Sequence, residues 1–199
     1  MKQTALVIVD VQADFCSGGA LAVPDADAVI PVVNQLAGGF DLVFFTQDWH
    51  PRGHVSFASS HPGKRPFSRV SLPYGEQILW PDHCIEETPG ARFHPHLRIP
   101  PTAKVIRKGT NRDTDSFSAF FENDRHTTVG LDALLREAGV REITLAGLAM
   151  DFCVLHTALD ARRLGYQVTV IEAGCRGIDV DGSLAAARAQ MEQAGVHRI

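Results

Sequence analysis

The strongest constraint in this sequence is a regular alternation of short apolar runs with amphipathic segments. The runs are continuous and rich in β-branched residues, as buried strands are, and they occupy residues 6–9, 42–45, 104–106, 143–146 and 167–171, with a last one from Val196. Between them, apolar residues recur with helical spacing in segments 29–36, 131–138, 154–159 and 184–194. Repeated strand–helix units favour right-handed βαβ crossovers. We therefore expect an α/β fold of three layers, with helices on both faces of a mainly parallel six-stranded sheet.

One long segment departs from this regularity. Residues 46–101 show little periodicity and are rich in His, Pro, Gly and Ser, yet they hold both tryptophans and six of the nine histidines. Irregular segments of this length are usually functional or disordered, and the aromatic content argues against disorder. A chain of 199 residues fits one domain. We expect a single domain over residues 1–199, with a metal- and substrate-binding insertion at about 46–101.

Composition excludes several classes of protein. With 19 Lys and Arg against 23 Asp and Glu, the net charge is −4, so nucleic acid is not an expected partner. No apolar stretch reaches membrane length, and the first run is too short for a signal peptide. The four cysteines form no Cys-x-x-Cys pair, and reduced thiols are expected in a core-forming chain without a secretory signal. We expect a cytoplasmic protein.

Chemically active residues follow the predicted strands. In open α/β sheets, ligands bind at the carboxyl ends of the strands, and the residues there are Asp10, Asp48 with His50, Lys108 and Cys153. Cys153 is expected in the first turn of a helix, with Asp151 as its N-cap, where the helix dipole lowers the pKa of a thiol. Asp10 would supply a base for this thiol and Lys108 a cation beside that base. Taken singly, such residues are more often a buried inert thiol, a turn carboxylate and a surface lysine.

Asp48 and His50 also predict a metal site. Residues i and i+2 of an extended chain project to the same side, and the third ligand is left open between His54, His61 and His83. Two imidazoles and a carboxylate suit catalytic zinc and, equally, non-haem Fe(II). The alternative is a loop with surface histidines and no metal.

Five blocks, taken together and in order, resemble the nicotinamidase (pyrazinamidase) family of isochorismatase-like cysteine hydrolases. They are Asp-x-Gln-x-Asp-Phe at 10–15, Thr-Gln-Asp-Trp-His-Pro at 46–51, Trp-Pro-Asp-His-Cys at 80–84, Lys-Gly at 108–109, and Gly-Leu-Ala-Met-Asp-Phe-Cys-Val at 147–154. The resemblance extends from about residue 3 to about residue 195. Met150, Phe117 and Phe152 depart from it, since Thr is frequent at the first position and Tyr at the other two.

The resemblance implies roles for particular residues. It implies a catalytic triad of Cys153, Asp10 and Lys108, and an oxyanion hole made by the backbone N–H groups of Ala149 and Cys153, beside a cis peptide at Leu148–Ala149. It implies metal ligation by Asp48, His50 and His83, with His54 a fourth ligand in some members. It further implies that three side chains form the walls around a pyridine ring: Phe15, Leu21 and Trp80.

The implied activity is hydrolysis of nicotinamide, and of pyrazinamide, to the acid and ammonia through a cysteine thioester. One divalent metal ion per chain is expected, with zinc ahead of iron and manganese; the partner is a small-molecule substrate, and a homo-oligomer is left open. The alternatives are another amide hydrolase of this superfamily, acting on N-carbamoyl or ureido amides, and a non-catalytic protein that binds metal or pyridines. The intact Asp-x-His and Trp-Pro-x-His blocks favour the first activity.

Overall fold

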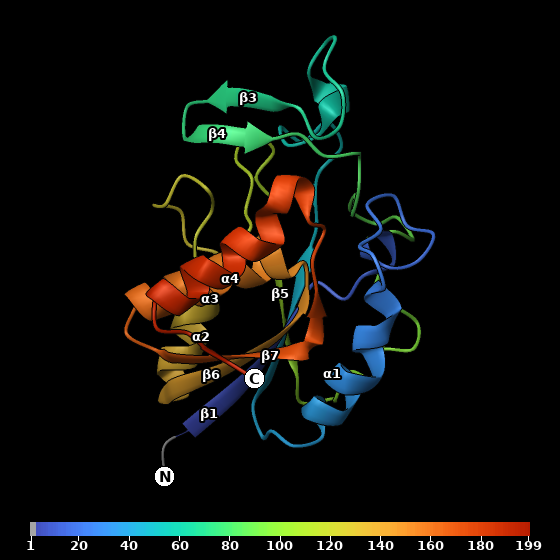
Figure 1. Cartoon of the computed structure of the whole chain (residues 1–199). Coiled ribbons are helices and arrows are strands. Elements are labelled where there is room, and N and C mark those ends of the chain that lie inside the picture. The colour runs from blue at the N-terminus through green and yellow to red at the C-terminus, as the bar shows by residue number, and fades with distance from the viewer. Residues whose placement is uncertain (1–2) are drawn as a thin grey trace.

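The computed structural model describes residues 3–199, and within that range six parallel strands form one sheet (Figure 1). In spatial order these strands are β5 (Lys104–Lys108), β2 (Val43–Asp48), β1 (Gln3–Val9), β6 (Val140–Leu148), β7 (Gln167–Arg176) and β8 (His197–Arg198). Each neighbouring pair is parallel. The predicted fold, an α/β structure with a parallel six-stranded sheet, is confirmed.

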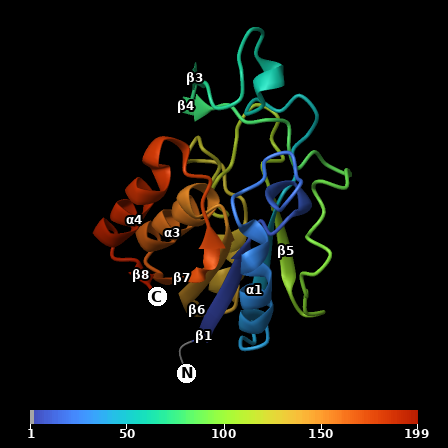
Figure 2. The same ribbon diagram turned by 45° about the vertical axis from the view of Figure 1, so that its right-hand side comes forward.

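Helices cover both faces of the sheet. The four α-helices of residues 3–199 are α1 (Val29–Ala37), α2 (Leu131–Glu137), α3 (Leu155–Arg163) and α4 (Ser183–Gln193). One face packs against α1, and the opposite face packs against the other three (Figure 2). None of the helices in this range is long and apolar enough to cross a membrane.

The central strand β1 explains the three layers. Its side chains alternate, so that Val7 and Val9 join the cluster under α2, α3 and α4, while Leu6 and Ile8 join the cluster under α1. All four are fully buried, and burial of each such side chain contributes about 1.5–3 kcal/mol. A continuous apolar run is therefore what a strand buried on both faces requires.

The segment 46–101 is more ordered than its sequence indicates. It contains an antiparallel hairpin of β3 (Arg69–Leu72) and β4 (Gly75–Ile78), which lies beyond the carboxyl ends of the sheet strands (Figure 1). The sequence analysis missed this hairpin because most of its side chains are polar and at least partly exposed, so the apolar alternation of a half-buried strand is absent.

Candidate active site

Four neighbouring strands place the candidate residues at one edge of the sheet. Asp10 directly follows β1, Asp48 and Lys108 are the last residues of β2 and β5, and Cys153 comes five residues after the end of β6. Asp48 and Lys108 are partners in the parallel register of β2 and β5. The strand order β5-β2-β1-β6 therefore brings together residues that are far apart in the sequence.

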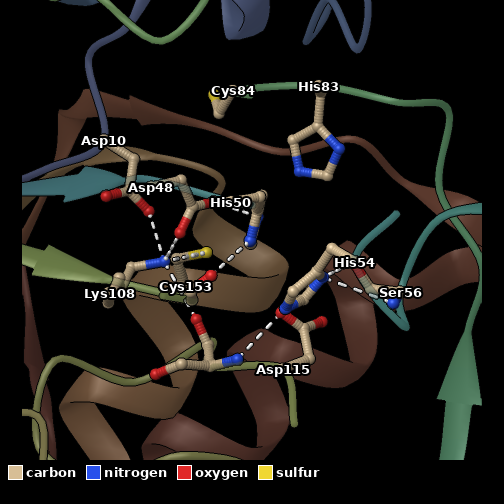
Figure 3. A network of polar contacts seen from close by, with 12 residues as sticks. Asp10, Asp48, His50, His54, Ser56, His83, Cys84, Lys108, Asp115 and Cys153 are labelled. Atoms are coloured by element: carbon tan, nitrogen blue, oxygen red, sulfur yellow. Dashed lines mark hydrogen bonds and ion pairs between the residues drawn. The ribbon is translucent and has the colours of Figure 1, made fainter. Parts of the chain in front are cut away.

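Lys108 lies at the centre of this group. Its Nζ forms an ion pair with Asp10 Oδ2 at 2.8 Å, donates to Asp48 Oδ1 at 2.5 Å, and lies 3.3 Å from Cys153 Sγ (Figure 3). A fourth contact, at 3.1 Å, goes to the carbonyl of Ser116. The side chains of Lys108 and Asp10 are fully buried. One carboxylate oxygen each of Asp10 and Asp48 and the Sγ atom of Cys153 lie within 4.8 Å of one another, so the thiol is close to both carboxylates.

Burial and charge set the protonation of this group. Burial raises the pKa of Asp10 to about 6, against the opposing Lys108 ammonium and with a contribution from Asp48. Burial also disfavours the charged form of Lys108, but Asp10 and Asp48 outweigh it and raise the pKa of Lys108. The pKa of Asp10 is thus close to neutral pH, as a general base requires.

The thiol of Cys153 differs from the sequence-based expectation. Burial raises its pKa well above the usual range; Lys108 opposes this shift, while Asp10 and Asp48 add to it. The expected lowering by a helix dipole was wrong because the thiol is buried beside two carboxylates. Cys153 lies in a π-helical turn, Met150–Val154, directly ahead of α3. The resting thiol is therefore protonated and needs a base before it can attack.

Asp151 was also predicted wrongly as an N-cap. Its carboxylate instead accepts hydrogen bonds from the amides of Ile178 and Asp179, at 3.0 and 2.8 Å, and from the hydroxyl of Ser183 at 2.5 Å. This carboxylate therefore anchors the turn that carries Cys153 to the segment between β7 and α4. The peptide bond Leu148–Ala149 is cis, as the resemblance implies.

Thr46 is a residue of the site that the sequence analysis gave no role. Its hydroxyl donates to Asp10 Oδ1 at 2.6 Å and accepts from the Asp10 amide at 3.1 Å. Asp10 has a left-handed backbone with φ 47°, a conformation that Asp tolerates better than most residues. The two hydrogen bonds from β2 fix this conformation and aim the carboxylate at Lys108.

A second group, Asp48, His50 and His83, offers ligand atoms that lie within 4.8 Å of one another. Nδ1 of His50 contacts the Gly109 carbonyl at 2.9 Å, and Nδ1 of His83 contacts the Pro81 carbonyl at 2.8 Å. A carbonyl only accepts, so both Nδ1 atoms carry a proton and both Nε2 lone pairs are available to a metal. These donors fit a divalent ion such as zinc.

The electrostatics of this second group favour a cation. Burial opposes ionisation of Asp48, but Lys108 and His50 hold its pKa well below the usual range. Burial also opposes the charging of His50, yet Asp48 raises the pKa of His50. Burial, together with His50, lowers the pKa of His83 to about 4, so the His83 imidazole is neutral near pH 7 and suited to metal binding.

Gly109 allows this arrangement. At φ 65°, a Cβ on Gly109 would lie 2.3 Å from the ring of His50, so only glycine lets the carbonyl approach the imidazole. Of the three candidates for the third ligand, His83 is in the group with Asp48 and His50, and His61 instead points Nε2 at the Val55 carbonyl, 2.7 Å away.

The two groups meet at a small, narrow cavity. The three predicted wall residues Phe15, Leu21 and Trp80 line it. The lining also contains the metal-type residues, which are Asp48, His50 and His83, and the predicted oxyanion-hole residues Ala149 and Cys153. Four further residues line the cavity, Asp115, Phe117, Phe152 and Ile178, of which Phe117 and Phe152 are two of the departures from the family that the sequence shows. A cavity with aromatic walls, one buried thiol and a polar end suits a small planar ligand.

A family model for the isochorismatase domain matches residues 4–199. The chain belongs to the isochorismatase family. Among curated members, it is 50% identical to a nicotinamidase of Acinetobacter baylyi, over all of this chain and 94% of that protein. The family and these relatives make the chain an amide hydrolase.

Two solved structures in the isochorismatase family share the fold in detail. The nicotinamidase and pyrazinamidase of Acinetobacter baumanii has a TM-score of 0.98 and 54% identity, covering 100% of this chain and 96% of its own. The pyrazinamidase of Pyrococcus horikoshii, solved in complex with zinc, has a TM-score of 0.81 and 33% identity, covering 99% and 98%. The resemblance to nicotinamidases seen in the sequence is therefore confirmed.

Proposed function

We propose that this enzyme hydrolyses nicotinamide, and also pyrazinamide, to the carboxylic acid and ammonia through a thioester on Cys153. The observation that carries the proposal is the buried contact of Lys108 with both Asp10 and Cys153 beside the aromatic cavity. The names of the relatives support the substrate class, since these proteins are nicotinamidases and pyrazinamidases. Phe15, Leu21 and Trp80 would hold the flat ring.

In the first half of the reaction, Asp10 removes the proton from Cys153, and the sulfur attacks the carboxamide carbon. The carbonyl oxygen takes the electron pair, and the N–H groups of Ala149 and Cys153 stabilise this oxyanion. When the oxyanion collapses, Asp10 returns the proton to the amide nitrogen and the C–N bond breaks. Ammonia leaves, and the acyl group remains bound to sulfur.

In the second half, water replaces ammonia. The water oxygen attacks the thioester carbon while Asp10 accepts a proton from the water, and the C–S bond then breaks. The thiolate of Cys153 recovers the proton from Asp10, and the carboxylic acid product gives its own proton to solvent and leaves as a carboxylate. Throughout, the Lys108 ammonium holds Asp10 in place and offsets the negative charge that forms on sulfur.

The metal site is proposed to consist of Asp48, His50 and His83, with zinc as the first candidate. A divalent ion held by these residues would supply positive charge for binding and orienting the ring nitrogen of the substrate. Lys108 donates to Asp48 Oδ1, which leaves Asp48 Oδ2 on the side of His50, 3.7 Å from Nε2. One carboxylate thereby serves both groups.

Ammonia release by the purified enzyme tests the proposal. We expect release from nicotinamide and pyrazinamide, suppression by a chelator, recovery with zinc, and no release by Cys153→Ala. N-carbamoyl amides serve as the comparison substrates: if they were hydrolysed and nicotinamide were not, the alternative amide hydrolase would replace this proposal. Binding of nicotinamide without turnover would instead support a non-catalytic binding protein.

A further inference from the structure

His54 is the third histidine beside the metal-type residues, and its ring is oriented opposite to the other two. The backbone amide of Ser56 donates to His54 Nδ1 at 3.3 Å, and the Ser56 hydroxyl lies 2.7 Å from the same nitrogen. A backbone amide only donates, so Nδ1 carries the lone pair, and the proton of the neutral ring is on Nε2. Where His50 and His83 present a lone pair at Nε2, His54 presents an N–H group.

This N–H group is buried and has no partner. His54 is fully buried, and its Nε2 makes no hydrogen bond. Buried polar atoms in folded proteins nearly always have a hydrogen-bond partner, and exceptions call for an explanation. The ring of His54 lies over that of His50, with centroids 4.2 Å apart, which keeps the N–H group next to the metal-type residues.

Asp115 supplies an acceptor at the same place. One ring nitrogen each of His50 and His54 and one carboxylate oxygen of Asp115 lie within 4.8 Å of one another, and all three residues are buried. Figure 3 shows the end of the His54 ring that faces away from Ser56 turned toward Asp115. A His54 ring nitrogen lies within 4.8 Å of the Asp115 carboxylate, and His54 Nε2 makes no direct hydrogen bond, so one bridging water with two bonds of about 2.8 Å fits between the two side chains.

The Asp115 carboxylate is itself held rigidly. Oδ1 accepts from the Ser116 amide at 2.8 Å, and Oδ2 accepts from Nε2 of Gln77, in β4, at 2.9 Å. Tyr74 of the same hairpin donates to the carbonyl of the Gln77 side chain at 3.1 Å. The hairpin therefore fixes a carboxylate that lines the cavity next to two imidazoles.

We propose that His54 is a hydrogen-bond donor and not a metal ligand, and that it forms with Asp115 a donor–acceptor pair that holds one water molecule. This water accepts from His54 Nε2 and donates to the Asp115 carboxylate, between His50 and the cavity. The pair positions solvent at the metal-binding end of the cavity, where the ring of the substrate is bound. The inference rests on the proposed function in one respect, the metal site of Asp48, His50 and His83.

Cobalt binding tests the inference without any measurement of turnover. Apo-enzyme and its variants are titrated with Co²⁺, and both the stoichiometry and the visible absorption of the bound ion are recorded. We expect His54→Phe to retain one equivalent with the wild-type spectrum, since no ligand is lost, whereas His83→Gln loses the ion. His61→Gln, in the same segment but outside the cluster, is the matched control and should behave as wild type.

Activity then tests the pair itself. We expect His54→Phe and Asp115→Asn to raise KM about 10-fold with smaller changes in kcat, and His54→Gln, which restores a donor, to recover part of the loss. Asp113→Asn, an exposed carboxylate in the same loop, is the control and should leave KM unchanged. If His54→Phe does not fold, as judged by thermal unfolding, His54→Gln serves in the cobalt titration.

The outcomes are distinguishable. A lost equivalent or an altered cobalt spectrum in the His54 variants, with His61→Gln unchanged, would make His54 a ligand and overturn the inference while leaving the proposed function intact. An unchanged KM in both His54→Phe and Asp115→Asn would overturn the pair. A wild-type protein that binds no divalent metal would overturn the proposed metal site and this inference with it.

Discussion

The strand-end group of Asp10, Lys108 and Cys153 is positioned by the sheet, whereas the loop group of His50, Trp80 and His83 belongs to a segment with little regular structure. In the first group, parallel register fixes the backbone, and the side chains are held by ionic contacts with each other. In the second, single bridges such as His50 with Ile85 and Phe57 with Trp80 hold the chain.

This difference has an energetic consequence. Lys108 of the strand-end group is buried between the carboxylates of Asp10 and Asp48, so each charge depends on the others for its solvation. The loop group is held mainly by hydrogen bonds from ring N–H groups to backbone carbonyls, and the Nε2 atoms of His50 and His83 are left available to a metal ion. Substitutions in the first group should therefore reduce both stability and activity, and those in the second should chiefly reduce metal and substrate binding.

The largest effect is expected from Cys153→Ala. Removing the nucleophile should lower kcat by at least about 10⁴-fold, because no other residue forms the thioester, while calorimetry shows nicotinamide still bound. Cys175→Ala is the control, since this buried thiol of β7 lies outside the cavity. Turnover by Cys153→Ala within tenfold of wild type would contradict covalent catalysis.

Lys108→Met tests whether the charges of the strand-end group stabilise the fold. Loss of the ammonium leaves Asp10 and Asp48 buried beside each other, so we expect the free energy of unfolding in urea to fall by about 3–5 kcal/mol, together with loss of activity. Lys104→Met changes an exposed lysine of the same strand, and its stability should stay within about 0.5 kcal/mol of wild type. Equal stabilities for the two variants would disprove the charge coupling.

His83→Ala tests the loop group in the same way. We expect metal affinity, measured by competition with a chelator, to fall by at least about 10–100-fold and KM to rise, because one of three ligands is lost. The free energy of unfolding of the apo-protein should change far less than in Lys108→Met. A variant that keeps the wild-type metal affinity would remove His83 from the ligand set.

The smallest effect is expected from Thr46→Val, which tests how the Thr46 hydroxyl sets the pKa of Asp10. Asp10 acts as a base only when ionised, so kcat/KM should rise with pH through its pKa of about 6. The Thr46 hydroxyl lowers the pKa of Asp10, and its removal should shift the acid limb to higher pH, with kcat/KM at neutral pH falling about tenfold. Thr144→Val, which changes a threonine of β6 outside the cavity lining, is the control. An unmoved acid limb in Thr46→Val would refute the role of Thr46.

Much of the strand-end group could be predicted because its residues follow apolar runs. Asp10, Asp48 and Lys108 come at or just after the ends of strands whose hydrophobic pattern is visible in the sequence, and parallel strands place such ends together. Thr46 was missed, since a threonine within a strand carries no signal of a side chain that bonds to a neighbouring strand. The shift in the pKa of Cys153 was missed because it depends on burial beside carboxylates from other strands.

The loop group could be predicted only in part. Asp48 and His50 share one side of an extended chain, but spacing alone left His54, His61 and His83 equivalent as third ligands. Which nitrogen each ring presents depends on its hydrogen-bond partners, such as Gly109 from the end of β5 and Pro81 next to His83. Asp115 had no signal at all, because its role depends on contacts with Gln77 in a hairpin that the sequence analysis did not predict.

The sequence by itself determined the layers, the parallel sheet and the edge at which the chemistry is placed, because these follow from short-range periodicity and from the handedness of βαβ units. Tertiary structure alone decided the protonation of Cys153, the anchoring of Asp151 and the opposite orientations of His54 and His83. Those properties depend on desolvation and on partners distant in the chain, and neither is encoded in the spacing of neighbouring residues.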